Sequence, residues 1–481
     1  MVEHFPIMAL GIDSCPAPES FEVVAPYDDE VIATVDAAGS EVVQKALATA
    51  TSLYEDRNAW LPVEQRINIL EKTAHIMQER QELLALGAAH EGGKPLCDSK
   101  VEVTRAIDGV KLCIESLRTE SGREIPMGLN TASAGRLAFT RKEPIGVVVA
   151  VSAFNHPLNL IVHQVTPAIA TGCPVIVKPA RETPLSCFRF VEILRESGLP
   201  EAWCQALAIS DLNVASELIT DQRVDFFSFI GSAKVGWMLR SKLSPGTRCA
   251  LEHGGVAPVI FAEDADIEDA LPLLAKGGFY HAGQVCVSVQ RIFAHASIAK
   301  DLANGIAKIA EQYVVGDPTV EQTDIGPLIR HAETDRVESW VSEAVAEGAE
   351  LISGGSKKSA SCYSCTVLYN PSQQSKVSQM EIFGPVICVY PYEDIDVAIA
   401  QANAVPFSFQ AAVFTRDIDR AMRVVNRINA SAVMVNDHTA FRVDWMPFAG
   451  LKQSGLGVGG MPYTMEDMQI EKMLVLRSKE L

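Results

Sequence analysis

Residues 143–157 read EPIGVVVAVSAFNHP, and this stretch decides the fold. The run from Ile145 to Ala153 is apolar and rich in valine, which is typical of a buried strand. It stops at Asn155, two residues before Pro157, so we expect a loop there. Loops at strand ends carry much of the chemistry of α/β proteins.

Further apolar runs of strand length follow, and helix-length segments separate them. They lie at Val175–Val177, Phe226–Ile230 and Val256–Phe261. Residues 40–90 are rich in Ala, Leu, Gln and Glu, with apolar side chains at helical spacing. Strands that alternate with helices indicate a parallel sheet. We therefore predict an α/β protein.

The composition indicates a soluble globular protein with more than one domain. The chain has 481 residues, of which 48% are hydrophobic and 21% charged, and this length suits two or three domains. The formal net charge is -19 and no cluster of Lys and Arg offsets it, so we expect neither a nucleic-acid partner nor an anionic membrane partner. No apolar run reaches the ~18 residues of a membrane span, and we see no secretion signal. The eleven cysteines lack a disulfide pattern and favour a reducing cytoplasm.

Three side chains in this sequence together supply a nucleophile, a base and an amide donor. Cys286 ends the sequence GQVC at 283–286, Glu252 opens EHGGVAPVIF, and Asn155 ends the valine-rich run. Each alone has an ordinary explanation: an inert buried cysteine, a surface glutamate and a turn asparagine. Together they are what the oxidation of an aldehyde through a covalent thioester requires.

The chain resembles the aldehyde dehydrogenase superfamily over nearly its whole length. The matching segments come in the family's order: EPIGVVVAVSAFNHP, PVIVKPARETPLS, FIGSAKVG, LEHGGVAPV, GQVC, EIFGPV and PFAGLKQSG. The stretches FNHPLNLIVHQ and FRVDWMPFAGLKQSG look closest to lactaldehyde and phosphonoacetaldehyde dehydrogenase-like members. The resemblance implies a Rossmann-like parallel-sheet cofactor domain, a second α/β catalytic domain and a small bridging β-sheet for oligomerisation.

The resemblance also implies domain boundaries and an assembly. Residues 1–121 and 145–252 are expected to form the dinucleotide-binding domain, and residues 253–448 the catalytic domain. Residues 122–144 and 465–481 are expected to bridge subunits into a homodimer or homotetramer. Leu474–Leu476 fit a strand that adds to a partner's sheet, the alternative being a strand packed on its own domain.

By the same resemblance, Cys286 attacks the aldehyde, while the Asn155 amide and a backbone N–H stabilise the oxyanion. Hydride transfer to NAD or NADP leaves a thioester, and Glu252 activates the water that hydrolyses it. Two alternatives stay open: a CoA-acylating enzyme, in which CoA replaces water, and a catalytically inactive structural relative. The presence of Glu252 argues against the first, and the complete set argues against the second.

The family's contacts to the dinucleotide fall on five matching positions. Gly231 and Ser232 follow a strand and open a helix, so backbone N–H groups and the helix dipole meet the pyrophosphate. Lys178 matches the family lysine at the adenine ribose. Glu381 and Phe383, in EIFGPV, match the residues that hold the nicotinamide ribose and ring.

A sixth position leaves the choice between NAD and NADP open. Arg181 stands three residues after Lys178, where NAD-preferring members often carry a glutamate. A cation there could accept the 2′-phosphate of NADP. It could equally point into solvent while Glu182 binds the ribose.

Three further residues are candidates for holding the substrate, a small hydroxylated or anionic aldehyde of the lactaldehyde, phosphonoacetaldehyde or semialdehyde type. Arg105, His156 and Arg442 fall in segments that line the family's substrate funnel. Two arginines and a histidine suit a phosphonate, sulfonate, phosphate or carboxylate. The alternative is that the arginines form structural salt bridges with Asp108 or Asp444.

Two short motifs are set aside, and no metal site is predicted. The GxGxxG pattern at 455–460 follows no strand, so a flexible loop is expected instead of a nucleotide site. The CxxC pair at 362–365 has no second pair or histidine cluster, and an exposed loop is expected there.

Overall fold

The valine-rich run forms β6 (Val148–Val151), which lies inside a parallel sheet. Our computed structural model describes residues 2–12, 15–16 and 18–481. Val148 and Ala150 pack into the core on one face of the sheet, and Val149 and Val151 into the core on the other, because successive side chains of a strand alternate. The strand order is β20 (Gly455–Leu456), β10 (Arg248–Glu252), β9 (Phe226–Ile230), β6, β7 (Val175–Lys178) and β8 (Cys204–Ala206), and only β20 runs antiparallel to its neighbour.

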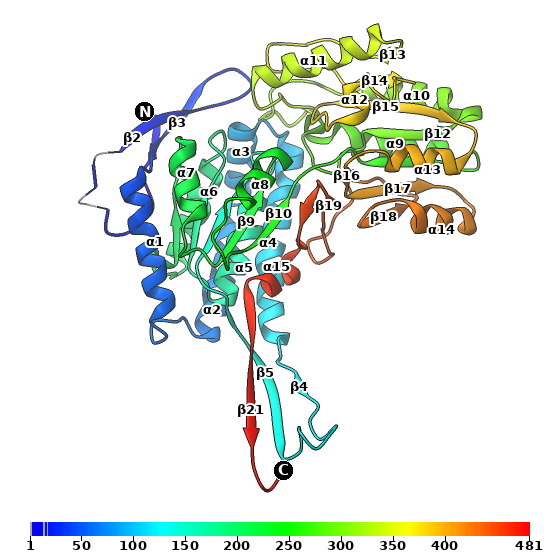
Figure 1. Ribbon diagram of the computed structural model, residues 1–481. Helices are drawn as coiled ribbons and strands as arrows, with labels where there is room; N and C mark the ends of the chain where they lie inside the picture. Colours follow the sequence, from blue (N-terminus) through cyan, green and yellow to red (C-terminus); the bar gives the residue numbers. More distant parts are fainter. Residues whose placement is uncertain (1, 13–14, 17) are drawn as a thin grey trace.

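Helices cover both faces of this first sheet, which confirms the predicted α/β class (Figure 1). The core on one face is formed with α2 (Val63–Glu79), α3 (Gln81–Gly92), α4 (Leu96–Thr119), α5 (Asn159–Thr171), α6 (Leu185–Glu196) and α15 (Met461–Asp467). The core on the other face is formed with α1 (Ser40–Glu55), α7 (Leu212–Thr220) and α8 (Ala233–Arg240). A short 3₁₀ turn, η1 (Glu201–Trp203), precedes β8.

A second sheet with its own core follows in the chain (Figure 1). Its order is β13 (Glu350–Ser353), β14 (Thr366–Tyr369), β15 (Val386–Tyr392), β12 (Arg291–His295), β11 (Pro258–Phe261), β17 (Gln410–Phe414) and β18 (Ala432–Val435), with only β13 antiparallel. Its helices are α9 (Ile267–Phe279), α10 (Ala296–Ala310), α11 (His331–Ala346), α12 (Lys376–Gln379), α13 (Ile395–Asn403) and α14 (Ile418–Arg427). Cys362 and Cys365 are both buried, and Cys365 belongs to this core, so the expectation of an exposed loop was wrong.

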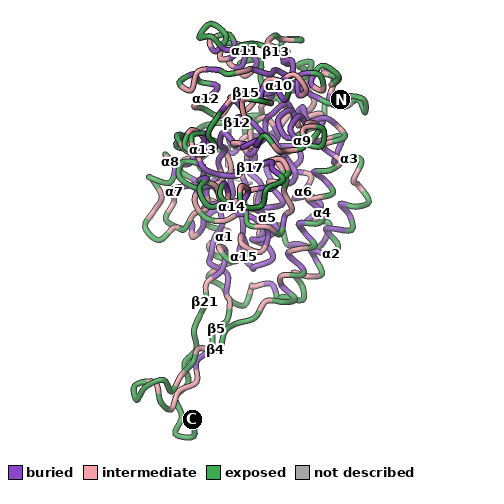
Figure 2. Tube along the Cα trace, turned by 90° about the vertical axis from the view of Figure 1, so that its right-hand side faces the viewer, coloured by how far each residue is buried: buried purple, intermediate pink, exposed green. Residues whose placement is uncertain are grey.

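Smaller sheets complete the fold. β21 (Gln469–Arg477) pairs with β5 (Arg136–Pro144), which also pairs with β4 (Glu124–Ile125), and together they form an arm that projects from the body (Figure 1). Much of this arm is exposed (Figure 2). The remaining pairings are β1 (Glu3–Phe5) and β2 (Glu19–Val24) on β3 (Val31–Ala37), and β16 (Phe407–Ser408) on β19 (Leu451–Lys452).

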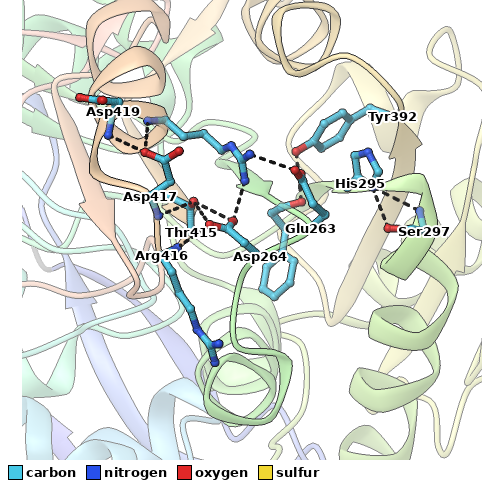
Figure 3. Close-up of polar contacts among 11 residues, drawn as sticks. Glu263, Asp264, His295, Ser297, Tyr392, Thr415, Arg416, Asp417 and Asp419 are labelled. Atoms are coloured by element: carbon cyan, nitrogen blue, oxygen red, sulfur yellow. Dashed lines mark hydrogen bonds and ion pairs between the residues drawn. The ribbon is translucent and has the colours of Figure 1, made fainter.

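A polar network ties together the carboxyl ends of β11 and β17 (Figure 3). The Thr415 hydroxyl donates to Asp264 Oδ1 over 2.8 Å, and the Arg416 N–H donates to Asp264 Oδ2 over 3.1 Å. Arg420 adds ion pairs to Asp264 at 2.7 Å and to Glu263 at 2.9 Å. Donors thus match both carboxylates, and the network stabilises the carboxyl end of β11. Glu252 precedes the opposite end of this strand.

Among the residues described, no helix is both long enough and apolar enough to cross a membrane.

Candidate active site

A cavity of about 470 Å³ opens where the carboxyl ends of β6, β9 and β10 meet loops of the second sheet. Ligands of parallel α/β sheets bind at this end of the strands. The cavity brings together ten of the twelve residues predicted from the sequence: Arg105, Asn155, His156, Gly231, Ser232, Glu252, Cys286, Glu381, Phe383 and Arg442. Lys178 and Arg181 are not among its lining residues.

The loop that carries Cys286 is held in an unusual backbone conformation. The 3₁₀ turn η2 (Tyr280–Gly283) contains His281 at φ 48° and Ala282 at φ 53°, and it ends on Gly283 at φ 70°. Residues other than glycine rarely adopt this left-handed backbone conformation, and backbone strain of this kind is common at functional sites. A Cβ on Gly283 would lie 2.1 Å from the Gly384 carbonyl oxygen. The glycine of GQVC is therefore required both by its φ and by this close approach.

Hydrogen bonds fix the position of this loop relative to Asn155. The Asn155 Nδ2 donates to the Gln284 carbonyl over 2.8 Å. The buried Gln284 side chain accepts from the Ile329 N–H at 3.0 Å and donates to the Pro327 carbonyl at 3.2 Å. A side-chain amide has two N–H groups, so Asn155 keeps a second one beyond the bond to Gln284.

The Cys286 thiol lies in an environment that keeps it protonated at rest. Burial raises the pKa of this thiol to about 12. The positive charge of Arg442 lowers that pKa, while the carboxylates of Glu381 and Glu252 raise it. Because the thiolate is the nucleophilic form, the reaction needs a group that takes the thiol proton.

Glu252 ends β10 and projects into the same cavity. Burial raises the pKa of its carboxyl group above the ordinary value, and Arg442 opposes that rise. A carboxylate whose pKa is raised towards neutrality is a better proton acceptor for catalysis.

The glycine-rich segment 455–460, for which the sequence predicts a flexible loop, packs against Glu252. β20 pairs Gly455 with Glu252 and Leu456 with Leu251. A Cβ on Gly459 would lie 2.3 Å from Glu252 Oε1. Gly455 and Leu456 thus form a strand where a loop was expected, because these glycines allow close packing, which spacing along the sequence does not reveal.

The structure fits a dinucleotide at the other side of the cavity. Ser232 is the N-cap of α8, so the first N–H groups of that helix follow directly on the Gly231–Ser232 turn. Glu381 Oε1 is buried and, among the described residues, has no hydrogen-bond partner. Burial raises the pKa of Glu381 to about 8. An unpartnered buried carboxyl oxygen suits the hydroxyl of a bound ribose.

Phe383 also lines the cavity. Its backbone has φ 49°, and its ring meets Phe154 edge-on at a centroid distance of 5.8 Å. A Cβ on Gly254 would lie 1.6 Å from Glu381 Oε1, so only a glycine at this position leaves room for the carboxylate.

Lys178 and Arg181 lie beside the cavity. Lys178 Nζ donates to the Pro179 carbonyl over 3.3 Å, and burial lowers its pKa although Glu182 opposes this. The exposed Arg181 guanidinium lies over the Phe21 ring, 5.4 Å from its centroid. Glu182 forms an ion pair with Arg330 at 3.4 Å. The Arg181 guanidinium thus remains open to solvent.

The two candidate arginines differ in their partners. Arg105 forms a two-pronged salt bridge with Asp444, at 3.1 Å from Nε and 2.6 Å from Nη2, which was the structural alternative considered for it. His163, which the sequence analysis missed, lies 2.8 Å from the same carboxylate. Burial disfavours the Asp444 anion, but the hydrogen bond from His163 and the charge of Arg105 hold its pKa well below the ordinary range. No motif marks His163, because its role comes from the packing of α5 beside the segment around Asp444.

Arg442 has weaker partners. Its guanidinium lies 3.6 Å from the centroid of the Phe448 ring, and its Nε is 3.7 Å from Asp444 Oδ1. That Nε is buried and, within the described part of the chain, makes no hydrogen bond. His156 lies near Tyr280, with 3.3 Å between Nε2 and the hydroxyl. Burial, together with the charge of Lys94, lowers the pKa of His156 well below its ordinary value, so this imidazole is neutral.

Comparisons with known proteins agree with this site. The profile of the Aldehyde dehydrogenase family matches residues 13–474. A 3-sulfolactaldehyde dehydrogenase from Priestia aryabhattai is 39% identical over 458 residues, which are 95% of each chain. A lactaldehyde dehydrogenase from Methanocaldococcus jannaschii is 36% identical over 462 residues, covering 95% of this chain and 97% of the relative.

Solved structures share the whole architecture. Aldehyde dehydrogenase 21 from Physcomitrella patens, in complex with the reaction product succinate, superimposes with a TM-score of 0.94 at 32% identity over 99% of both chains. A glyceraldehyde-3-phosphate dehydrogenase from Methanocaldococcus jannaschii, in complex with NADP, gives a TM-score of 0.91 at 35% identity over 96% of this chain and 99% of that one. The chain belongs to the aldehyde dehydrogenase family and oxidises an aldehyde with NAD or NADP.

Proposed function

We propose that this enzyme oxidises a small hydroxylated aldehyde that carries an anionic group, of the sulfolactaldehyde type, to its acid. The observation that carries the proposal is the buried, weakly partnered Arg442 in the cavity of Cys286 and Glu252. A guanidinium offers planar pairs of donors that match sulfonate, phosphate or carboxylate oxygens. The relatives named for sulfolactaldehyde and lactaldehyde support the same class.

Carbon–sulfur bond formation is assigned to Cys286. As Sγ bonds to the aldehyde carbon, the thiol proton passes to Glu252 and the aldehyde oxygen gains negative charge. The second N–H of the Asn155 amide and the Cys286 backbone N–H stabilise that oxygen. An oxyanion donor of this kind typically contributes about 3 kcal/mol to transition-state stability.

Hydrolysis is assigned to Glu252. When bound, NAD or NADP supplies a hydride acceptor at the nicotinamide ring. After the hydride has left, the acyl group remains on Cys286 as a thioester. Glu252 first releases the thiol proton to solvent and then takes a proton from water as the water oxygen bonds to the acyl carbon. The carbon–sulfur bond breaks, the acid leaves, and the Cys286 thiolate takes this proton back from Glu252. The presence of this base in the cavity supports water over CoA as the acyl acceptor.

The dinucleotide is assigned to the side of the cavity formed by Gly231, Ser232, Glu381 and Phe383. The N-terminus of α8 would meet the pyrophosphate. Glu381 would accept from the ribose hydroxyls, and Phe383 would hold the ring. Lys178 lies beside this region and is assigned to the adenine ribose.

The substrate anion is assigned to Arg442, with His156 as a neutral hydrogen-bonding neighbour. Arg105 contributes indirectly: its salt bridge neutralises Asp444, which would otherwise pair more strongly with Arg442. A hydrogen bond to a charged group contributes about 1.5–3 kcal/mol, which corresponds to roughly a 10- to 150-fold change in affinity. The anionic group of the substrate should therefore dominate selectivity.

Replacing Arg442 by glutamine should lower kcat/KM for 3-sulfolactaldehyde about 10- to 150-fold more than for uncharged lactaldehyde. The ratio of the two values is the measurement, because Arg442 also lowers the pKa of Cys286 and its loss affects both substrates. Arg442→Lys, which keeps the charge, is the control. An unchanged ratio in the glutamine variant would exclude Arg442 as the anion site.

Replacing Arg181 by glutamine should raise KM for NADP up to about fivefold, since one exposed charge contact contributes up to roughly 1 kcal/mol. KM for NAD should stay within about twofold, because NAD lacks the 2′-phosphate. Initial rates with both cofactors at saturating aldehyde measure this. Arg330→Gln is the matched exposed control. Equal effects on NAD and NADP would show that Arg181 points into solvent in the complex.

Alkylation of Cys286 by iodoacetamide in the free enzyme should accelerate about tenfold per pH unit between pH 7 and 9. The reason is that a thiol with pKa about 12 is protonated throughout this range, and the thiolate fraction rises as pH rises towards the pKa. Peptide mass spectrometry at timed intervals measures the rate. A plateau below pH 8 would show that the resting thiol is already ionised.

We also propose domain boundaries, an assembly and a cellular compartment for this chain. Residues 1–121 and 145–252 would hold the cofactor, 253–448 would carry the nucleophile, and 122–144 with 465–481 would join subunits into a dimer or tetramer. The projecting arm supports this, because Leu474 and Val475 on β21 are about half exposed. The eleven cysteines are free thiols, most of them buried, which favours a reducing cytoplasm.

A further inference from the structure

Behind the cavity lies a fully buried ion pair that the proposed mechanism does not use. Lys94 Nζ and Glu102 Oε2 are 2.8 Å apart, and both side chains have no solvent exposure. Neither residue lines the cavity. They belong to the corner where the chain leaves α3 at Gly93 and enters α4. Burying two charges is unfavourable unless the pair and its remaining polar atoms are well satisfied, so a buried ion pair is weak evidence of added stability.

Glu102 connects this pair to the loop of Asn155. Its second carboxylate oxygen, Oε1, accepts from the N–H of Leu158 at 2.9 Å and of Asn159 at 3.0 Å. These groups open α5, whose N-cap Leu158 has no capping side chain of its own. A carboxylate at this place both satisfies free N–H groups and matches the helix dipole. Glu102 therefore caps, from α4, the helix that begins four residues after Asn155.

Lys94 connects the same pair to the loop of Cys286. Its ammonium lies over the Tyr280 ring, 5.3 Å from the centroid, and Tyr280 opens the left-handed turn that leads to Cys286. The Tyr280 hydroxyl in turn lies 3.3 Å from His156 Nε2. The two loops meet in front of the pair, where Asn155 donates to the Gln284 carbonyl. The Lys94–Glu102 ion pair thus contacts the segments that carry Asn155 and Cys286, close to the hydrogen bond that joins them.

We infer that Lys94 and Glu102 are positioning residues that set the placement of the Asn155 amide relative to the Cys286 loop. The inference rests on the roles proposed above for Asn155 and Cys286. A side chain that only filled the core would have no reason to join these two segments through charge. Reacting groups must be held closely, since a misplacement of about 1 Å can lower the rate about 100-fold.

The test uses the full-length double variant Lys94→Met/Glu102→Gln, which leaves no unpaired charge in the core. Folded enzyme is counted by circular dichroism and by stoichiometric cofactor binding. Per folded enzyme, we expect kcat to fall about 10- to 100-fold while KM for NAD or NADP stays within about threefold. Lys94→Arg, which keeps the charge over the ring, should restore most of kcat. Wild-type kcat in the folded double variant would overturn the inference.

Glu91→Gln is a matched control on the same corner. Glu91 is equally buried, and it caps α6 by accepting from the N–H of Leu185 at 2.7 Å and of Ser186 at 2.8 Å. α6 adjoins neither Asn155 nor Cys286, so this variant should lose stability without a comparable fall in kcat. An equal fall in kcat for Glu91→Gln would show that the loss in the double variant is not specific to the Asn155 and Cys286 loops, and it would overturn the inference.

Two further variants keep the outcome decisive. If the double variant does not fold, Glu102→Asp replaces it: the shorter carboxylate keeps its charge but cannot reach both Lys94 and α5, so kcat should fall about tenfold. Full activity of folded Glu102→Asp would also overturn the inference. Asn155→Ala, assayed alongside, separates the proposed role of Asn155 from the positioning role of the ion pair. Wild-type activity in that variant would refute the proposed role of Asn155 and not the geometry of the pair.

Discussion

Cys286→Ser should lower kcat for aldehyde oxidation at least about 10⁴-fold, the largest effect expected from any single substitution in the chain. A serine hydroxyl has the same size, but it is far less acidic and less nucleophilic than a thiol. Because burial already raises the pKa of the thiol to about 12, Glu252 cannot ionise a still weaker acid to a useful extent. Initial rates of NADH or NADPH formation with lactaldehyde and 3-sulfolactaldehyde measure the loss.

The control for this substitution is another cysteine in the same chain. Cys97 is exposed on α4 and outside the cavity lining, so Cys97→Ser should keep wild-type rates. Cofactor binding to Cys286→Ser should also remain, because Cys286 is not part of the assigned dinucleotide site. Residual turnover above about one hundredth of the wild-type value would show that another group forms the covalent bond.

Glu252→Gln should stop the reaction after one turnover, the second largest effect. An amide cannot take a proton from water, so the thioester on Cys286 should hydrolyse about 10²- to 10⁴-fold more slowly. The first carbon–sulfur bond still forms at high pH, where water or hydroxide can take the thiol proton. Rapid-mixing absorbance should therefore show a burst close to one reduced cofactor per subunit, followed by a slow steady rate.

Hydroxylamine provides the control for Glu252→Gln. It is nucleophilic without a general base, so adding it should restore turnover and yield a hydroxamate. Absence of both the burst and the rescue at high pH would mean that Glu252 is needed before the thioester forms even when hydroxide can take the thiol proton. Steady turnover at the wild-type rate would remove Glu252 from the mechanism.

Much of the catalytic side of the site could be predicted from the sequence, because short motifs fix it. The valine-rich run before Asn155 is itself strand β6, and GQVC carries its own turn in Gly283. The end of β10 likewise places Glu252 beside the cavity. In each case the local sequence determines both the strand or turn and the functional residue that stands at its end.

The surroundings of these residues could not be predicted, because they depend on contacts between distant segments. Arg105 and Asp444 are 339 residues apart, so only the fold shows that they neutralise each other and leave Arg442 as the weakly partnered cation. Gly459 was dismissed with its glycine-rich segment, although it packs against Glu252. Lys94 passed unnoticed, since a lysine at a helix start is ordinarily solvated.

The most direct test of the account is intact-protein and peptide mass spectrometry of Glu252→Gln after mixing with 3-sulfolactaldehyde and NAD or NADP at high pH, where hydroxide can take the thiol proton. The account predicts one added sulfolactoyl group per subunit, located on the peptide that contains Cys286 and removed by hydroxylamine. Formation of stoichiometric reduced cofactor without any adduct on Cys286 would contradict it.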